Sequence, residues 1–130
     1  MSPELFKQRT KTYALNILRL TDGLPISRPT NVIAGQLLRS GTSVGANYRA
    51  ACRARSTADF ISKMGIVEEE CDESIYWMEI LEESGKVKTA DLLELKCEGA
   101  EILAMVVASI NTARTRRNNP QSAIRNPQPK

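Results

Sequence analysis

The chain of 130 residues is long enough for one domain with a hydrophobic core and too short for two. Its net charge of +3 is too small to indicate a nucleic-acid partner by itself. However, residues 1–55 and 102–130 are basic, whereas residues 56–101 are acidic. Two explanations fit this distribution: oppositely charged helices pack beside each other, within one chain or between copies, or a basic surface is kept for a polyanion.

Three widely spaced cysteines and the lack of histidine exclude a Cys/His zinc site and argue against a disulfide framework. A reducing cytoplasm fits this composition. The first residues contain no basic segment followed by an apolar run, so no secretory signal is predicted. The longest apolar run, 102–108, is much shorter than the roughly 20 residues of a membrane helix. We therefore expect a cytoplasmic protein without a membrane segment.

The first predicted helix starts at Ser2, whose hydroxyl suits an N-cap, and at Pro3, which suits the first turn. Gly23 and Pro25 end it, because glycine favours a C-terminal cap and proline cannot continue the hydrogen-bond ladder. Between these limits, apolar residues recur every three or four positions and form one face. They are Phe6, Tyr13, Ile17, Leu20 and Leu24, with Thr10 filling a gap.

The second predicted helix is capped by Thr30 or Asn31 and runs to about Ala54. Its interior holds Gly41 and Gly45, and each glycine costs about 1 kcal/mol relative to alanine. Either the helix breaks there or the bare backbone lets another helix come close, and we favour close approach. A phosphate-binding loop is disfavoured, because no strand precedes these glycines and no lysine follows them directly. The apolar face consists of Ile33, Leu37, Val44, Tyr48 and Ala51.

Two further helices complete the predicted fold. The third runs from its N-cap, Ser56, to about Ser84, and its apolar seam comprises Phe60, Met64, Val67, Cys71, Ile75, Met78 and Leu81. The fourth is capped by Thr89 and ends near residues 114–117, with a stripe of Leu92, Leu95, Gly99, Ile102, Val106 and Ile110. The sequence thus predicts an all-α, antiparallel up-down-up-down four-helix bundle over residues 1–117 and a disordered basic tail over residues 118–130.

The candidate chemistry is limited by the lack of histidine, which is the commonest general base. A di-metal carboxylate bundle is the main enzymatic alternative, because such bundles supply glutamates from facing helices. They also use a Glu-x-x-His element, which this chain cannot form. We therefore predict no enzymatic activity, no catalytic residue, no metal site and no cofactor.

Asn47, Glu70 and Glu73 are candidates for a polar link between the second and third helices. If the third helix runs back along the second, the two carboxylates are expected near the depth of Asn47, whose amide would satisfy one of them. Alternatively, all three side chains are simply exposed, or they form a ligand site.

Tyr76 and Trp77 lie on either side of the apolar seam of the third helix, so both cannot point fully into one bundle. An aromatic ring on an outer face is more often part of a protein interface than a platform for stacking bases. We therefore predict that one of the two rings lies at a contact between subunits.

Two groups of arginines are the candidates for contacting nucleic acid: Arg49, Arg53 and Arg55 near the end of the second helix, and Arg114, Arg116 and Arg117 near the end of the fourth. We expect the two groups at opposite ends of the bundle, so that they do not merge within one subunit. Each group has two interpretations. The arginines either complement the helix dipole at a C-terminus or bind phosphates.

A family resemblance rests on an ordered set of residues in the second and third helices. The set comprises Ser43-Val44-Gly45-Ala46-Asn47-Tyr48-Arg49, Ser56, Asp59-Phe60-Ile61, Lys63, Glu70, Glu73 and Tyr76-Trp77. With this set the chain resembles the four-helix-bundle family named after the 23S ribosomal RNA intervening-sequence protein. The resemblance implies a continuous second helix and a ring-shaped homo-oligomer, commonly a pentamer. Related bundles include the accessory variability determinant of diversity-generating retroelements, which associates with a reverse transcriptase and nucleic acid.

The expected protein is thus a non-enzymatic, self-associating binding or scaffold module. Its expected partners are other copies of itself, RNA or another nucleic acid, and a protein that processes nucleic acid. The alternative is an adaptor that binds only protein, in which the basic helices face the acidic helix of a neighbouring subunit.

Overall fold

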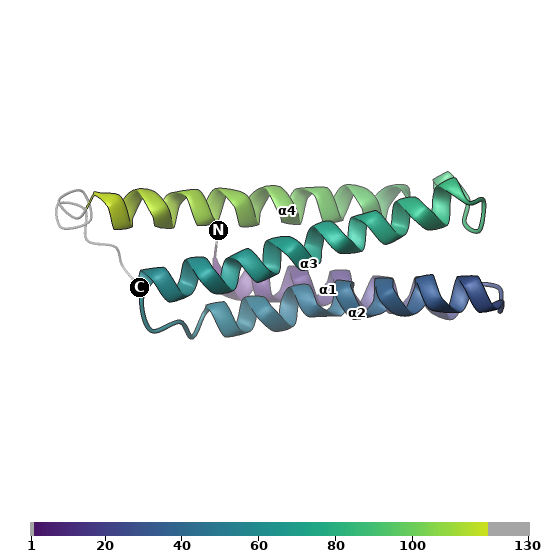
Figure 1. The fold of residues 1–130 in the computed structure, drawn as a ribbon, viewed down its shortest axis with the longest axis horizontal. Helices are drawn as coiled ribbons and strands as arrows, with labels where there is room; N and C mark the ends of the chain where they lie inside the picture. The colour runs from purple at the N-terminus through teal and green to yellow at the C-terminus, as the bar shows by residue number, and fades with distance from the viewer. Residues whose placement is uncertain (1, 120–130) are drawn as a thin grey trace.

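Residues 2–119 are described by a computed structural model, in which they form four antiparallel helices and no strand (Figure 1). The helices are α1 (Pro3–Asp22), α2 (Arg28–Ala51), α3 (Thr57–Glu83) and α4 (Thr89–Asn118). Each helix packs against the next one along the chain, and of the neighbouring pairs α1 and α4 pack least. This arrangement confirms the predicted all-α, up-down-up-down bundle. None of the helices described is both long and apolar enough to cross a lipid bilayer.

The starts of α1 and α3 agree with the prediction, whereas those of α2 and α4 do not. The hydroxyls of Ser2 and Ser56 accept the backbone N–H groups of residues three positions on. The predicted caps of α2 are wrong, because Ser27 caps this helix and accepts the N–H of Thr30 at 3.2 Å. At α4, Thr89 is the first helical residue, and the cap position before it has no side-chain hydrogen bond.

The ends of two helices also differ from the predicted ends. The second helix ends at Ala51 instead of near residue 54, and α4 continues to Asn118, a residue that the sequence places in the tail. Asn119 follows as the C-cap of α4, and residues 120–130 of the predicted tail lie outside the described residues.

The core is formed by the predicted faces of α1, α2 and α4, and by the predicted seam of α3 with two changes. There, Ile61 is buried while Phe60 is half-buried, and Ser74 is fully buried while Ile75 is half-buried. A buried serine is tolerated because its hydroxyl is satisfied. Its Oγ lies 2.8 Å from the Tyr13 hydroxyl and 2.7 Å from the carbonyl oxygen of Cys71. Serine gives no apolar signal, so the seam predicted from hydrophobic spacing misses it.

The two glycines inside α2 permit close packing against α1, and the helix is continuous through them. A Cβ atom at Gly41 would overlap the side chain of Ile17, and one at Gly45 would lie 3.0 Å from Thr10 Oγ1. The glycine pair therefore marks the close approach of two helices, as predicted.

Candidate nucleic-acid interface

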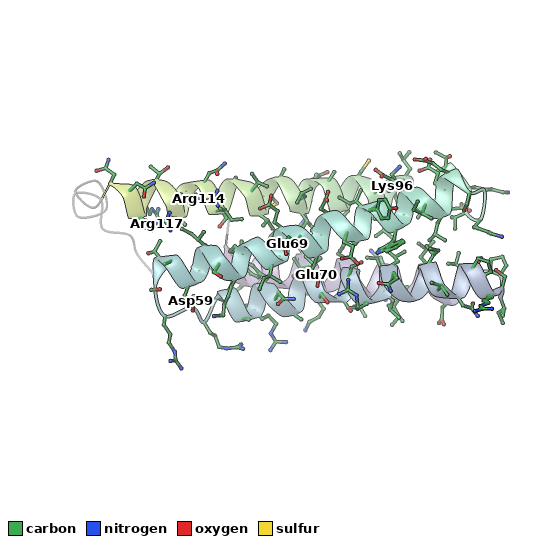
Figure 2. The ribbon with its side chains drawn as sticks, in the orientation of Figure 1. Asp59, Glu69, Glu70, Lys96, Arg114 and Arg117 are labelled. Carbon is green, nitrogen blue, oxygen red and sulfur yellow. The ribbon has the colours of Figure 1, made fainter. Side chains whose placement is uncertain are left out.

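The two groups of arginines lie at the same end of the bundle, so the prediction of opposite ends was wrong. In an up-down-up-down bundle the second and fourth helices run in the same direction, and their C-termini therefore share one end (Figure 1). Figure 2 shows Arg114 and Arg117 at the end where Asp59 lies, whereas Glu69 and Glu70 are near the middle of the bundle and Lys96 is toward the far end. Arg55 and Arg116 line one common cleft.

This end carries a strong excess of positive charge. It comprises residues 2–8, 46–66 and 105–119, here called the basic end, and it contains eight lysines or arginines against two acids. Both acids are engaged, since Glu4 pairs with Lys7 at 3.6 Å and Asp59 with Lys63 at 2.7 Å. All six predicted arginines are exposed, and none of their side chains forms an ion pair within residues 2–119. The basic end is therefore suited to attract an anion.

The connection between α2 and α3 is held in place by Asp59. Its carboxylate accepts hydrogen bonds from the Lys63 ammonium and, at 3.2 Å, from the backbone N–H of Arg55. The hydrogen bond from Lys63 is the main cause that lowers the pKa of Asp59, and the one from Arg55 adds to it. Since Asp59 stays ionised, it anchors the short segment that carries Arg53 and Arg55.

A cleft of about 990 Å³ opens at the basic end, and we call it the end cleft. It exists because α1 has 20 residues and α4 has 30, which correspond to about 30 Å and about 45 Å of helix. The last turns of α4 therefore extend past the start of α1 (Figure 1). The wall contains the half-buried Phe60, and the cleft is also bordered by Lys7, Arg55 and Arg116.

A second hollow, of about 460 Å³, is formed by residues around the connection that follows α2. It is lined by Ala50, Arg53, Arg55, Asp59 and Lys63. Arg55 lines both hollows, so the two share one cationic residue.

The predicted polar link from Asn47 is wrong. The Asn47 amide donates to the carbonyl oxygen of Ser43 on its own helix, while Glu70 and Glu73 both accept from Arg39. Antiparallel register explains the difference. Asn47 lies four residues before the end of α2, so it faces the region four residues into α3, and Glu70, thirteen residues into α3, faces the region near Arg39. A link between α2 and α3 therefore exists, but with arginine as its donor.

Tyr76 and Trp77 differ in exposure. Trp77 packs partly against the core, and its indole Nε1 donates to Glu73 at 3.0 Å. This hydrogen bond, together with Arg39, lowers the pKa of Glu73. Tyr76 is 50% exposed and meets the Trp77 ring edge-on, with centroids 5.0 Å apart. Of the two rings, Tyr76 thus offers the larger free surface, and its place at a subunit contact stays a prediction.

Arg9 is a bridging residue that the sequence analysis missed. Its guanidinium donates to both carboxylate oxygens of Glu98, at 2.7 and 2.8 Å, and to Glu101 at 2.8 Å. These hydrogen bonds raise the pKa of Arg9 and lower that of Glu98. They join α1 to α4 across the least-packed side of the bundle. Little in the sequence indicates this pair, because Arg9 and Glu98 are 89 residues apart and each lies beside an apolar stripe instead of within it.

The cysteines are all free, and Cys71 alone is buried. Burial raises the pKa of the Cys71 thiol to about 12, so it stays protonated at neutral pH. Among residues 2–119, no three or more Cys, Asp or Glu side chains are grouped as a metal ion would need.

Fold and site together define a four-helix bundle with one strongly basic end. The family model of the 23S rRNA-intervening sequence protein matches residues 5–108, and the chain belongs to this family. It is also similar to the crystal structure of a protein of unknown function from the S23 ribosomal protein family of Bacteroides thetaiotaomicron. The two chains are 32% identical with a TM-score of 0.79, over 85% of this chain and 99% of the other. A comparison with curated proteins gave no match.

Proposed function

We propose that the protein is a non-enzymatic, self-associating scaffold of the cytoplasm that contacts RNA or another nucleic acid through the arginines of its basic end. The observation that carries the proposal is the gathering of six exposed arginines at one end, none of which forms an ion pair within residues 2–119. The family description, which names a ribosomal RNA insert, agrees with an RNA partner.

The proposed mechanism is phosphate contact. Guanidinium groups bind phosphate oxygens strongly but carry no sequence information, so binding would tolerate many sequences. Each contact releases counterions from the nucleic acid, and affinity would therefore fall steeply as salt rises. A ring of copies, for which we propose a pentamer with contacts at Tyr76 and Trp77, would present several basic ends and increase the avidity. A protein that processes nucleic acid is a further proposed partner.

The double substitution Arg49→Ala and Arg53→Ala is expected to weaken binding of a labelled RNA oligonucleotide about tenfold or more at low salt, because two phosphate contacts are lost. The matched control replaces Arg19 and Arg28, which are also exposed arginines but lie at the opposite end, and should change affinity less than about twofold. Fluorescence anisotropy measures both, with light scattering to verify that the assembly is unchanged. Equal losses in the two double variants would contradict a localised RNA site.

The second candidate is an adaptor that binds only protein. It is favoured by the exposed acids Glu69 and Asp72 of α3, which form no ion pair within residues 2–119 and could face the basic end of a neighbouring copy. Absence of RNA binding at low salt, combined with dissociation of the assembly at high salt, would favour this candidate over the first.

A further inference from the structure

The end cleft has an interior and a border of different chemistry. Its wall is built mainly from small or apolar side chains, including Phe60, Met105, Ala108 and Ala113. The cations that border it are Lys7, Arg55 and Arg116, of which only Lys7 has a paired acid within residues 2–119. A ligand that fits both parts combines an apolar body with anionic groups at its edge.

Two hydroxyls add a polar element to the wall. Ser109 and Thr112 lie three residues apart on α4 and both line the cleft, and neither hydroxyl makes a hydrogen bond within the described part of the chain. Hydroxyls can donate and accept, so they suit a flat ring with mixed donors and acceptors on its edge. A phosphate group placed inside would lose its water and meet few donors, which favours keeping phosphates at the border.

We propose that the end cleft receives one unstacked nucleobase of single-stranded RNA, with the ring against Phe60, the base edge toward Ser109 and Thr112, and the flanking phosphates on Arg55 and Arg116. This inference rests on the proposed function and specifies its ligand. The volume of the cleft, about 990 Å³, is in the range of sites that enclose small ligands, so a base has room without rearrangement. Single-stranded binding proteins combine the same two elements, aromatic platforms and a basic path for the backbone.

The test compares two labelled oligonucleotides of about twelve nucleotides, one a single strand of uridines and one with the same sugar–phosphate backbone but no bases. Wild-type protein is expected to bind the strand with bases at least about fivefold more tightly, because the base gains contact with the cleft. Two variants then remove that advantage without changing any charge: Phe60→Leu takes away the ring, and Ala108→Leu fills the cleft. Ala100→Leu is the matched control, since Ala100 is exposed on the same helix but does not line the cleft.

The inference is supported if Phe60→Leu and Ala108→Leu each lower the affinity for the strand with bases by at least about fivefold. Neither variant should change the affinity for the base-free strand. Ala100→Leu should change the affinity for neither strand. Equal binding of the two oligonucleotides by wild-type protein would overturn the cleft inference and leave phosphate contact by arginines intact. Lack of binding to either oligonucleotide at low salt would overturn the proposed function and the inference with it. Thermal unfolding of each variant separates these results from a loss of fold.

Discussion

Replacing Tyr76 with glutamate is expected to reduce the mass in solution from that of the proposed multi-copy assembly to the 14.4 kDa of one chain. The Tyr76 ring is 50% exposed and leans on the half-buried Trp77, so the two form an aromatic surface on α3. Aromatic residues in this situation are typical of the centre of protein interfaces. A carboxylate buried there without a partner costs on the order of several kcal/mol, enough to separate the copies. Light scattering on the purified protein measures the mass.

The control for this variant is Leu15→Glu, which introduces the same charge at another exposed apolar residue. Leu15 is 42% exposed and lies on α1, which packs on α2 and hardly on α4, away from α3. Its variant should keep the mass of the wild-type assembly. If the wild-type, Tyr76→Glu and Leu15→Glu proteins all had the same mass, the proposed interface would be contradicted.

Replacing Gly99 with alanine is expected to lower the free energy of unfolding by about 2 kcal/mol. A Cβ atom at Gly99 would lie 2.7 Å from the Tyr13 hydroxyl oxygen and 3.1 Å from Ile75 Cγ1. The Tyr13 ring is fully buried and its hydroxyl is held by Ser74, so it has little freedom to move. Overpacking costs about 1–3 kcal/mol and the lost hydrogen bond about 1 kcal/mol, whereas the higher helix propensity of alanine returns about 1 kcal/mol.

Gly65→Ala is expected to have the opposite effect and raise the free energy of unfolding. Gly65 lies inside α3, and a Cβ atom there would meet nothing within 4 Å. This variant should therefore be more stable than wild type by about 0.5–1 kcal/mol, the helix propensity alone. Urea denaturation of the two variants measures both changes. A Gly99→Ala protein as much stabilised as Gly65→Ala would show that Tyr13 relaxes without cost, and would contradict the predicted overpacking.

The helices and most of their buried faces could be predicted because they depend on residues close together in the sequence. The recurrence of Phe6, Tyr13 and Ile17 on α1, or of Ile102, Val106 and Ile110 on α4, indicates the buried side without knowledge of any neighbour. Caps were less certain, since Ser27, Thr30 and Asn31 are all acceptable N-cap residues and only the backbone geometry distinguishes them.

The candidate site could be predicted only in part, because it depends on which residues face each other across helices. The clustering of the six arginines in the sequence identified them as candidates. Their position at one end follows only from the common direction of α2 and α4 in the bundle. The partners of Arg9 and Arg39 follow from the register of α4 and α3, which side-chain patterns within one helix do not define. The end cleft arises from the unequal lengths of α1 and α4, a consequence of where each helix begins and ends.

The dependence of RNA affinity on salt tests the role of the basic end most directly. Wild-type protein and a single-stranded RNA would be titrated by anisotropy between about 50 and 200 mM salt. If the six arginines contact phosphates, the logarithm of the binding constant should fall linearly with that of the salt concentration, with a slope near −4, or about −0.7 for each contact. An affinity that does not change with salt, or no binding at the lowest concentration, would contradict phosphate recognition by this end of the bundle.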